Sequence, residues 1–374
     1  EECSVAQAYD NYEQMLIEEK PDCVYIAVTP NDHFRLTMLC LEHRVPVLCE
    51  KAMFTNSAEA KAVFEKAEKD QTFVMEAMWS RFLPAVNQAK KWAAEGKIGR
   101  LEALQGRIGF LAPEGADNRY HSPLLCGGAA TDITVYAYEI ATWLVNEPVR
   151  KTYAAANLDQ TGVDLTDQVT VKFEHVLADL VKSFAAPMGN SMVIYGREGR
   201  IELPDPHYAS KCFLYGADGT LKEEFTDTTT QKGFTYEIEE TIRCVRAKKT
   251  ESPVVPHATT IACAELFDQI QAQAVAWAVA SVDEGEIDRI NILNARMLAM
   301  DRAIQALDPA PEYALIDGNR NTGIRCPNET VVKGDGRSAS IAAASILAKV
   351  SRDRYIMEVL DRQYPQYQFA KHKG

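Results

Sequence analysis

Three short apolar runs, each followed by a stretch of helical character, constrain the fold of the first part of the chain more than any other feature. The runs are CVYIAV (Cys23 to Val28), VPVLCE (Val45 to Glu50) and TFVMEA (Thr72 to Ala77). They are rich in β-branched and aromatic residues and do not alternate with polar residues, which is typical of strands buried on both faces. Strands and helices that alternate at this spacing predict βαβ units and a doubly wound parallel sheet.

Two helices are predicted between these strands. The first covers Phe34 to His43 and the second Ala58 to Lys69. Asn56 precedes the second helix and Glu59 follows three residues later, which is the pattern of a capping box.

After about Gly99 the pattern changes to short strand-like segments separated by turn signals. This predicts a second, α+β domain with a largely antiparallel sheet, and with helices at Ala130 to Leu144 and Tyr236 to Ala247 packed on one face. The strand segments are LEALQGRIGF, KTYAAANL, VTVKFE, LADLVKSFAA, SMVIYG and RIELP.

Helical character returns from Thr259. Farther on, apolar residues from Ile290 to Leu307 recur at intervals of three and four, which predicts one helix with a core-facing stripe. YALID and TVVK then have the character of strands, and a long helix is predicted over Ala339 to Leu360. We expect three domains, at residues 1–98, 99–272 and 273–374, although no Pro/Gly linker marks the last junction.

Charge and cysteine content restrict the classes of function. The net charge of −13 lies before the last junction, because the segment from Gln273 onward contains 13 basic and 13 acidic residues. An acidic surface disfavours general nucleic-acid binding by the front part. The nine cysteines show no CxxC spacing, and no run of 18 apolar residues occurs. These features predict reduced thiols and a cytoplasmic protein that does not enter a membrane.

Several motifs in the first 272 residues resemble the Gfo/Idh/MocA oxidoreductases. They are VTPNDH (Val28 to His33), Glu50-Lys51, the pair Gly127-Gly128 with Asp132 and Tyr136, and EAMWSRFLP (Glu76 to Pro84). The last motif and Tyr136 are most similar to the dihydrodiol and D-xylose dehydrogenase branch. The resemblance implies an oxidoreductase that uses NADP or NAD on a sugar, diol or polyol hydroxyl. Cofactor contacts are then expected from Thr29, Pro30, Asn31, His33, Glu50 and Lys51.

The chemistry of hydride transfer suits three of these residues. The alcohol needs a group that takes up or returns its proton. Tyr136 can do so if the neighbouring ammonium of Lys51 favours its phenolate, and Asp132 can orient the substrate or relay the proton. The three come from separate segments, so the fold must bring them together.

Two departures from this family weaken the expected activity. The family's GxGxxG turn, which holds the pyrophosphate, would precede residue 1, and Ala52 replaces the Pro of most relatives. We therefore expect weakened cofactor binding, and also an exposed sheet edge that favours a homo-oligomer.

The segment from about Gln273 to Gly374 resembles ribonuclease HII instead. The resemblance rests on APEYALIDGN, VVKGD, SIAAASILAKVSRD and YPQYQFAKHKG. It implies cleavage of RNA in RNA–DNA hybrids with Mg²⁺ or Mn²⁺, and Asp317 and Asp335 match two of the metal-binding carboxylates. The family's DExGRG motif has no match, since Asp283-Glu284 precedes a helix without GRG, so we expect weakened metal binding.

Three functions therefore remain open: a dehydrogenase, a hybrid-specific endonuclease, and a catalytically inactive fusion of two fragments. The dehydrogenase is favoured because its motifs cover the larger part of the chain.

Overall fold

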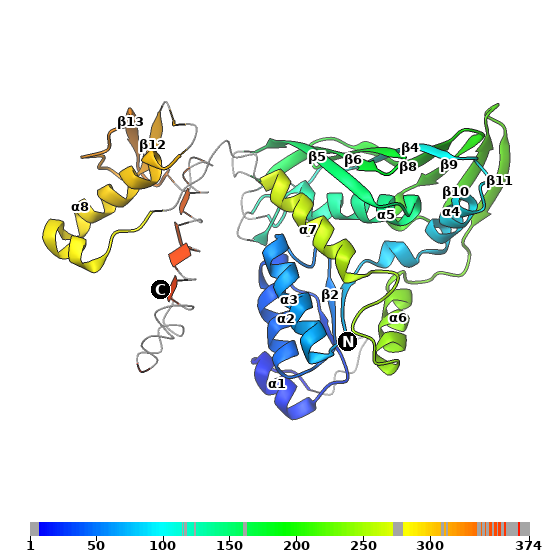
Figure 1. The fold of residues 1–374 in the computed structure, drawn as a ribbon, viewed down its shortest axis with the longest axis horizontal. Helices are drawn as coiled ribbons and strands as arrows, with labels where there is room; N and C mark the ends of the chain where they lie inside the picture. The colour runs from blue at the N-terminus through cyan, green and yellow to red at the C-terminus, as the bar shows by residue number, and fades with distance from the viewer. Residues whose placement is uncertain are drawn as a thin grey trace. The chain divides into compact units, whose positions relative to one another are not determined.

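The computed structural model describes residues 7–113, 115, 118–122, 125–159, 163–271, 280–307, 310–311, 313–334, 338, 341, 344–345, 348–349, 351–352, 355–356 and 366. The chain divides into two compact units, one of residues 1–157 with 163–271 and the other of residues 158–162 with 272–374. Each unit has its own helices and strands (Figure 1). No helix of the described residues is long and apolar enough to cross a membrane.

The three apolar runs form a parallel sheet, as their composition predicts. Its strands, in the spatial order β1-β2-β3, are β1 (Val24–Ile26), β2 (Val47–Glu50) and β3 (Val74–Ala77). β3 is buried along its whole length, which agrees with the continuous apolar run. The helices gathered beside these strands are α1 (Tyr12–Glu19), α2 (His33–Glu42) and α3 (Ser57–Asp70) (Figure 1).

The start of α3 confirms the predicted cap. Oδ1 of Asn56 accepts the backbone N–H of Glu59 at 3.0 Å. This bond satisfies one of the amide groups that a helix leaves without a partner in its first turn. The helix then buries Val63, Phe64 and Ala67 in the core beneath the parallel sheet.

The second sheet has eight strands in the order β11-β10-β9-β8-β4-β7-β6-β5. The prediction of a largely antiparallel sheet is confirmed, but β4 and β7 at its centre are parallel. The strands are β4 (Leu101–Gly109), β5 (Val149–Leu158), β6 (Asp164–Phe173), β7 (Leu177–Ser183), β8 (Met188–Gly196), β9 (Gly199–Pro204), β10 (Lys211–Gly216) and β11 (Leu221–Thr226).

Two helices cover this sheet, and a third predicted to do so does not. α4 (Pro84–Ala94) packs against β9 and β10, and α5 (Val135–Val145) packs against β4 and β7. α6 (Phe234–Arg246) packs mainly against the short helix η2 (Trp79–Phe82) instead. Gly233, just before α6, lies so close to the Trp79 ring that an added Cβ would be 2.1 Å from it. The predicted packing of this helix on the sheet is therefore wrong.

α7 (His257–Gln271) contacts both the strand β3 and the helix α3. Thr260 Oγ1 donates to the buried Glu76 of β3 at 2.8 Å, and the His257 ring stacks on Phe64 of α3 at 4.0 Å. Lys61 of α3 forms an ion pair with Glu265 at 2.6 Å. These contacts tie α7 to the first unit.

The second unit contains α8 (Glu284–Gln305) and the parallel strands β12 (Ala314–Asp317) and β13 (Asn328–Val331). Asn291 has φ 64° and ψ 161°, so α8 is kinked there. The predicted stripe is therefore not one continuous face, since Met297 is 6% exposed but Leu293 is 38% exposed. The predicted helix over Ala339 to Leu360 falls largely outside the described residues.

Candidate active site

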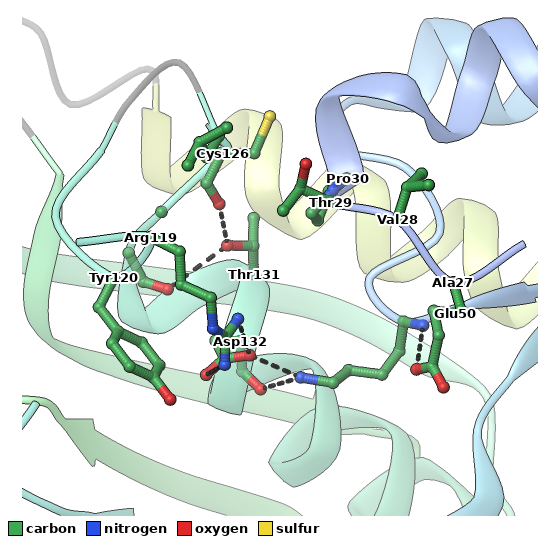
Figure 2. Close-up of a pocket in the computed structure, with 14 residues that line it drawn as sticks. Ala27, Val28, Thr29, Pro30, Glu50, Arg119, Tyr120, Cys126, Thr131 and Asp132 are labelled. Atoms are coloured by element: carbon green, nitrogen blue, oxygen red, sulfur yellow. Dashed lines mark hydrogen bonds and ion pairs between the residues drawn. The ribbon is translucent and has the colours of Figure 1, made fainter. Parts of the chain in front are cut away.

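A cavity of about 230 Å³ lies at the carboxyl ends of β1 and β2. This is the edge of a parallel sheet where ligands of open α/β folds bind. One wall comes from the loop after β1 and from Glu50 and Lys51 at the end of β2; the facing wall comes from residues that precede and begin the α5 helix (Figure 2). The lining residues are Ala27, Val28, Thr29, Pro30, Glu50, Lys51, Arg119, Tyr120, Leu125, Cys126, Gly127, Gly128, Thr131 and Asp132.

Lys51 and Asp132 meet across this cavity. Lys51 Nζ lies 2.7 Å from Asp132 Oδ1 and also donates to the Asp132 carbonyl oxygen at 2.8 Å. Both side chains are mostly buried, at 13% and 17% exposure. Burial alone would raise the pKa of Asp132, but Lys51, together with Arg119, holds it below its ordinary value. Lys51 and Asp132, which the sequence places in separate motifs, thus form an ion pair. The peptide bond between Lys51 and Ala52, in the turn after β2, is cis.

Tyr136 lies one helical turn beyond Asp132, and its ring packs beneath Lys51. Lys51 Nζ is 4.7 Å from the ring centroid, and the Tyr136 hydroxyl accepts the indole N–H of Trp79 at 2.8 Å. Burial raises the pKa of Tyr136, although the bond from Trp79 opposes this shift. Burial disfavours the charged phenolate, so the role of Lys51 in favouring that form stays a prediction. The neutral hydroxyl can still donate a hydrogen bond.

The loop after β1 divides into residues that line the cavity and residues that support it. Thr29 and Pro30 line the cavity, whereas Asn31 is exposed outside the lining. His33 is completely buried; its Nε2 lies 3.0 Å from the Val28 carbonyl and its Nδ1 lies 3.1 Å from that of Ala52. His33 thus links the loop after β1 to the turn after Lys51, and burial lowers its pKa.

Glu50 lines the cavity but is already engaged. Its carboxylate accepts the hydroxyl of Tyr25 from β1, and its Oε2 accepts the backbone N–H of Lys51 at 3.2 Å. These bonds hold the end of β2 in place beside the cavity.

Two side chains at the site were not anticipated from the sequence. Arg119 contributes two contacts of 3.4 Å to Asp132, and Trp79 donates to Tyr136. Trp79 lies within the EAMWSRFLP motif, but the sequence does not indicate that its indole N–H bonds to Tyr136. Arg119 belongs to none of the quoted motifs, and only the fold brings it to Asp132.

The second unit brings together only part of its predicted metal site. Asp317 ends β12, and its Oδ1 accepts the backbone N–H of Gly334 at 2.8 Å. Asp335 lies outside the described residues. Among the described residues, no three His, Cys, Asp or Glu side chains cluster as metal ligands would.

Family comparisons divide the chain in the same order. Residues 1–78 match the oxidoreductase family with an NAD-binding Rossmann fold, and residues 86–202 match the GFO/IDH/MocA C-terminal domain. Residues 258–374 match ribonuclease HII, so this match begins earlier than the predicted junction and includes all of α7 after its first residue.

Curated relatives also fall into two groups. A ribonuclease HII of Psychromonas ingrahamii is 57% identical over 109 residues, which are 29% of this chain and 53% of that protein. The chain thus spans about half the length of this relative. A trans-1,2-dihydrobenzene-1,2-diol dehydrogenase of Danio rerio is 29% identical over 282 residues, covering 72% of this chain and 82% of that protein.

Solved structures share the fold of the front part. A levoglucosan dehydrogenase in complex with NADH and levoglucosan has a TM-score of 0.64 at 19% identity, covering 71% of this chain and 81% of its own. An aldose-aldose oxidoreductase of Caulobacter crescentus has a TM-score of 0.63 at 18% identity, covering 71% and 80%. The chain is therefore a mosaic of matches: its front part matches the two domains of the Gfo/Idh/MocA oxidoreductases, and its last part matches ribonuclease HII.

Proposed function

We propose that the front part is an NAD- or NADP-dependent dehydrogenase that acts on a hydroxyl group of a sugar, diol or polyol. The observation that carries this proposal is the pairing of Lys51 and Asp132 in the cavity, with 2.7 Å between the ammonium and the carboxylate, and with the ring of the buried Tyr136 centred 4.7 Å from the same ammonium. Relatives named for diol, levoglucosan and aldose substrates support the substrate class.

The cavity suits a nicotinamide nucleotide, because it lies at the carboxyl ends of parallel strands and is lined partly by the backbone of a glycine pair. Thr29, Pro30 and Glu50 would border the cofactor, and the contact expected from Asn31, which is exposed outside the lining, stays a prediction. We assign His33 a supporting role, since its ring bonds to the backbone beneath the loop. When bound, the cofactor supplies or accepts the hydride.

Lys51 is the group that we place at the reacting oxygen. In the reductive direction, its ammonium donates a hydrogen bond and then a proton to the carbonyl oxygen of the substrate. Asp132 keeps the lysine oriented and offsets its charge, and Arg119 helps to keep Asp132 ionised. Tyr136 donates a second hydrogen bond, while Trp79 fixes its hydroxyl oxygen. In the oxidative direction, the proton returns to the lysine.

Steady-state turnover with NADPH and NADH over aldoses, polyols and a trans-diol tests this proposal. We expect Lys51→Met to lower kcat/KM by about 10²–10⁴-fold, the usual contribution of a proton-transfer group. Lys66→Met is the matched control, because Lys66 forms a 2.8 Å ion pair with Asp70 away from the cavity. Equal activity of Lys51→Met and the wild-type chain would overturn the assignment.

For the last part of the chain, we propose a contact with RNA–DNA hybrids that uses Mg²⁺ or Mn²⁺ at Asp317 and Asp335. The identity of 57% to a ribonuclease HII supports it. Cleavage of a labelled hybrid in Mg²⁺ or Mn²⁺ should be abolished by Asp317→Asn and kept by Asp288→Asn, an exposed carboxylate of α8. Absence of both activities in the wild-type chain would favour the inactive fusion.

The domain limits of 1–98, 99–272 and 273–374 stay a proposal; the family matches change between residues 78 and 86, and the ribonuclease HII match begins at residue 258. Self-association and a cytoplasmic location stay predictions. The eight cysteines in the described part of the chain are free thiols, which supports the predicted location.

A further inference from the structure

The helix that carries Asp132 and Tyr136 begins without a cap from its own segment. It opens with the π-helical turn η4 (Ala130–Thr134), and Ala129 at the N-cap position has no side chain that accepts a hydrogen bond. The first amide groups of a helix need such an acceptor. Asp164, the first residue of β6, supplies it from another part of the chain, because its Oδ2 accepts the Ala130 N–H at 2.6 Å.

Gly128 makes room for this acceptor. Its φ is 116°, and a Cβ added there would lie 2.2 Å from Asp164 Oδ1. Any larger residue would therefore displace the carboxyl group or the start of the helix. Gly128 and Asp164 thus pack directly against each other beside the cavity.

A second carboxyl group holds the other end of the same turn. Asp167 Oδ2 accepts the hydroxyl of Thr134 at 2.6 Å, and Asp167 Oδ1 lies 2.8 Å from Lys182 Nζ. Asp167 and Lys182 are opposite each other on the antiparallel strands β6 and β7, and both side chains are completely buried. Buried ion pairs add little net stability for their desolvation cost, but they can fix one arrangement of the chain.

We propose that Asp164, Asp167, Lys182 and Thr134, here called the buried polar cluster, are positioning residues that set the η4 turn and so direct Asp132 and Tyr136 toward Lys51. The role rests on the proposed dehydrogenase function. None of the four residues lines the cavity. They act through the helix start, since Asp132 lies inside the turn and Tyr136 lies two residues after it.

The protonation state of Asp164 suggests which substitution should be tolerated. Burial and the nearby Asp167 raise the pKa of Asp164 to about 8. A neutral carboxyl group accepts the Ala130 N–H with one oxygen and can donate to Asp167 with the other. Asn presents the same acceptor and donor, so Asp164→Asn should preserve the arrangement that Asp164→Ala removes.

The indole N–H of Trp79 provides a reporter that does not depend on catalysis, because it donates to the Tyr136 hydroxyl. The chain has four tryptophans, so ¹⁵N-tryptophan labelling gives four indole signals, and Trp79→Phe assigns the relevant one. We expect Asp164→Ala to shift the Trp79 signal and to lower kcat by about tenfold or more with a smaller change in KM, as misplaced catalytic groups do. Asp164→Asn should keep the wild-type signal and most of the turnover.

Val171→Ala is the matched control, since Val171 is a fully buried residue of the same strand without a bond to η4. It should lower thermal stability but leave the Trp79 signal in place.

If Asp164→Ala does not fold, Thr134→Val removes one bond of the cluster with little change in shape and should shift the same signal. A Trp79 signal that moves no more in these variants than in Val171→Ala overturns the proposal. A wild-type chain without turnover would refute the dehydrogenase, while the Trp79 signal would still decide the role of the cluster.

Discussion

Glu237 lies on α6 with its side chain fully buried, and neither of its carboxylate oxygens accepts a hydrogen bond from the described residues. Burial, with a smaller contribution from Glu50, raises its pKa from the ordinary value of 4.5 to about 9. Between these two values the folded chain holds a proton that the unfolded chain releases. The free energy of unfolding therefore falls as pH rises across this window.

This linkage gives a prediction for Glu237→Gln. Gln is neutral at every pH, so it avoids the cost of burying a charge, and the gain in melting temperature over the wild type should grow steadily from pH 5 to pH 9. Thermal melts at several pH values measure the difference. Glu239→Gln, at an exposed position of the same helix, should give a difference that does not change with pH. Parallel pH profiles for Glu237→Gln and the wild type would contradict the buried, protonated carboxyl group.

The residues of the candidate site show how far single positions can be predicted. Lys51 and Asp132 could be identified because motif and chemistry coincide, and they form an ion pair in the fold. The direction of the pKa shift of Tyr136 could not be predicted from the sequence, because it depends on the burial of the side chain and on the hydrogen bond from Trp79. Desolvation arises from tertiary packing, which no local spacing encodes.

Elements were predictable where the pattern was local and strong. The three apolar runs and the Asn56 cap gave the parallel sheet and the start of α3, because burial on both faces and a capping side chain leave direct marks in the sequence. β11 was not predicted because it is an exposed edge strand in which half of the residues are charged, LKEEFT, so it shows no apolar alternation. The kink at Asn291 was not predicted, because apolar residues spaced three and four apart indicate a helix but carry no information on the backbone angles of a single residue.

At the scale of the whole molecule, each of the two compact units buries apolar residues of its own. Val171 of β6 is buried in the first unit, and Met297 of α8 and Ile316 of β12 are buried in the second. Stability of a core depends mainly on the contacts within it, and a buried Val→Ala or Met→Ala change costs roughly 1–5 kcal/mol by loss of burial and by cavity formation. A substitution in one core should then leave the unfolding of the other unchanged.

We therefore expect two transitions when the full chain is heated in a calorimeter. Val171→Ala should lower the temperature of one transition only, and Met297→Ala should lower that of the other only. The size of each transition enthalpy, which scales with the number of residues that unfold, assigns the larger peak to the first unit. A single transition that both variants shift equally would mean that the two parts unfold as one cooperative unit, although they match two different families.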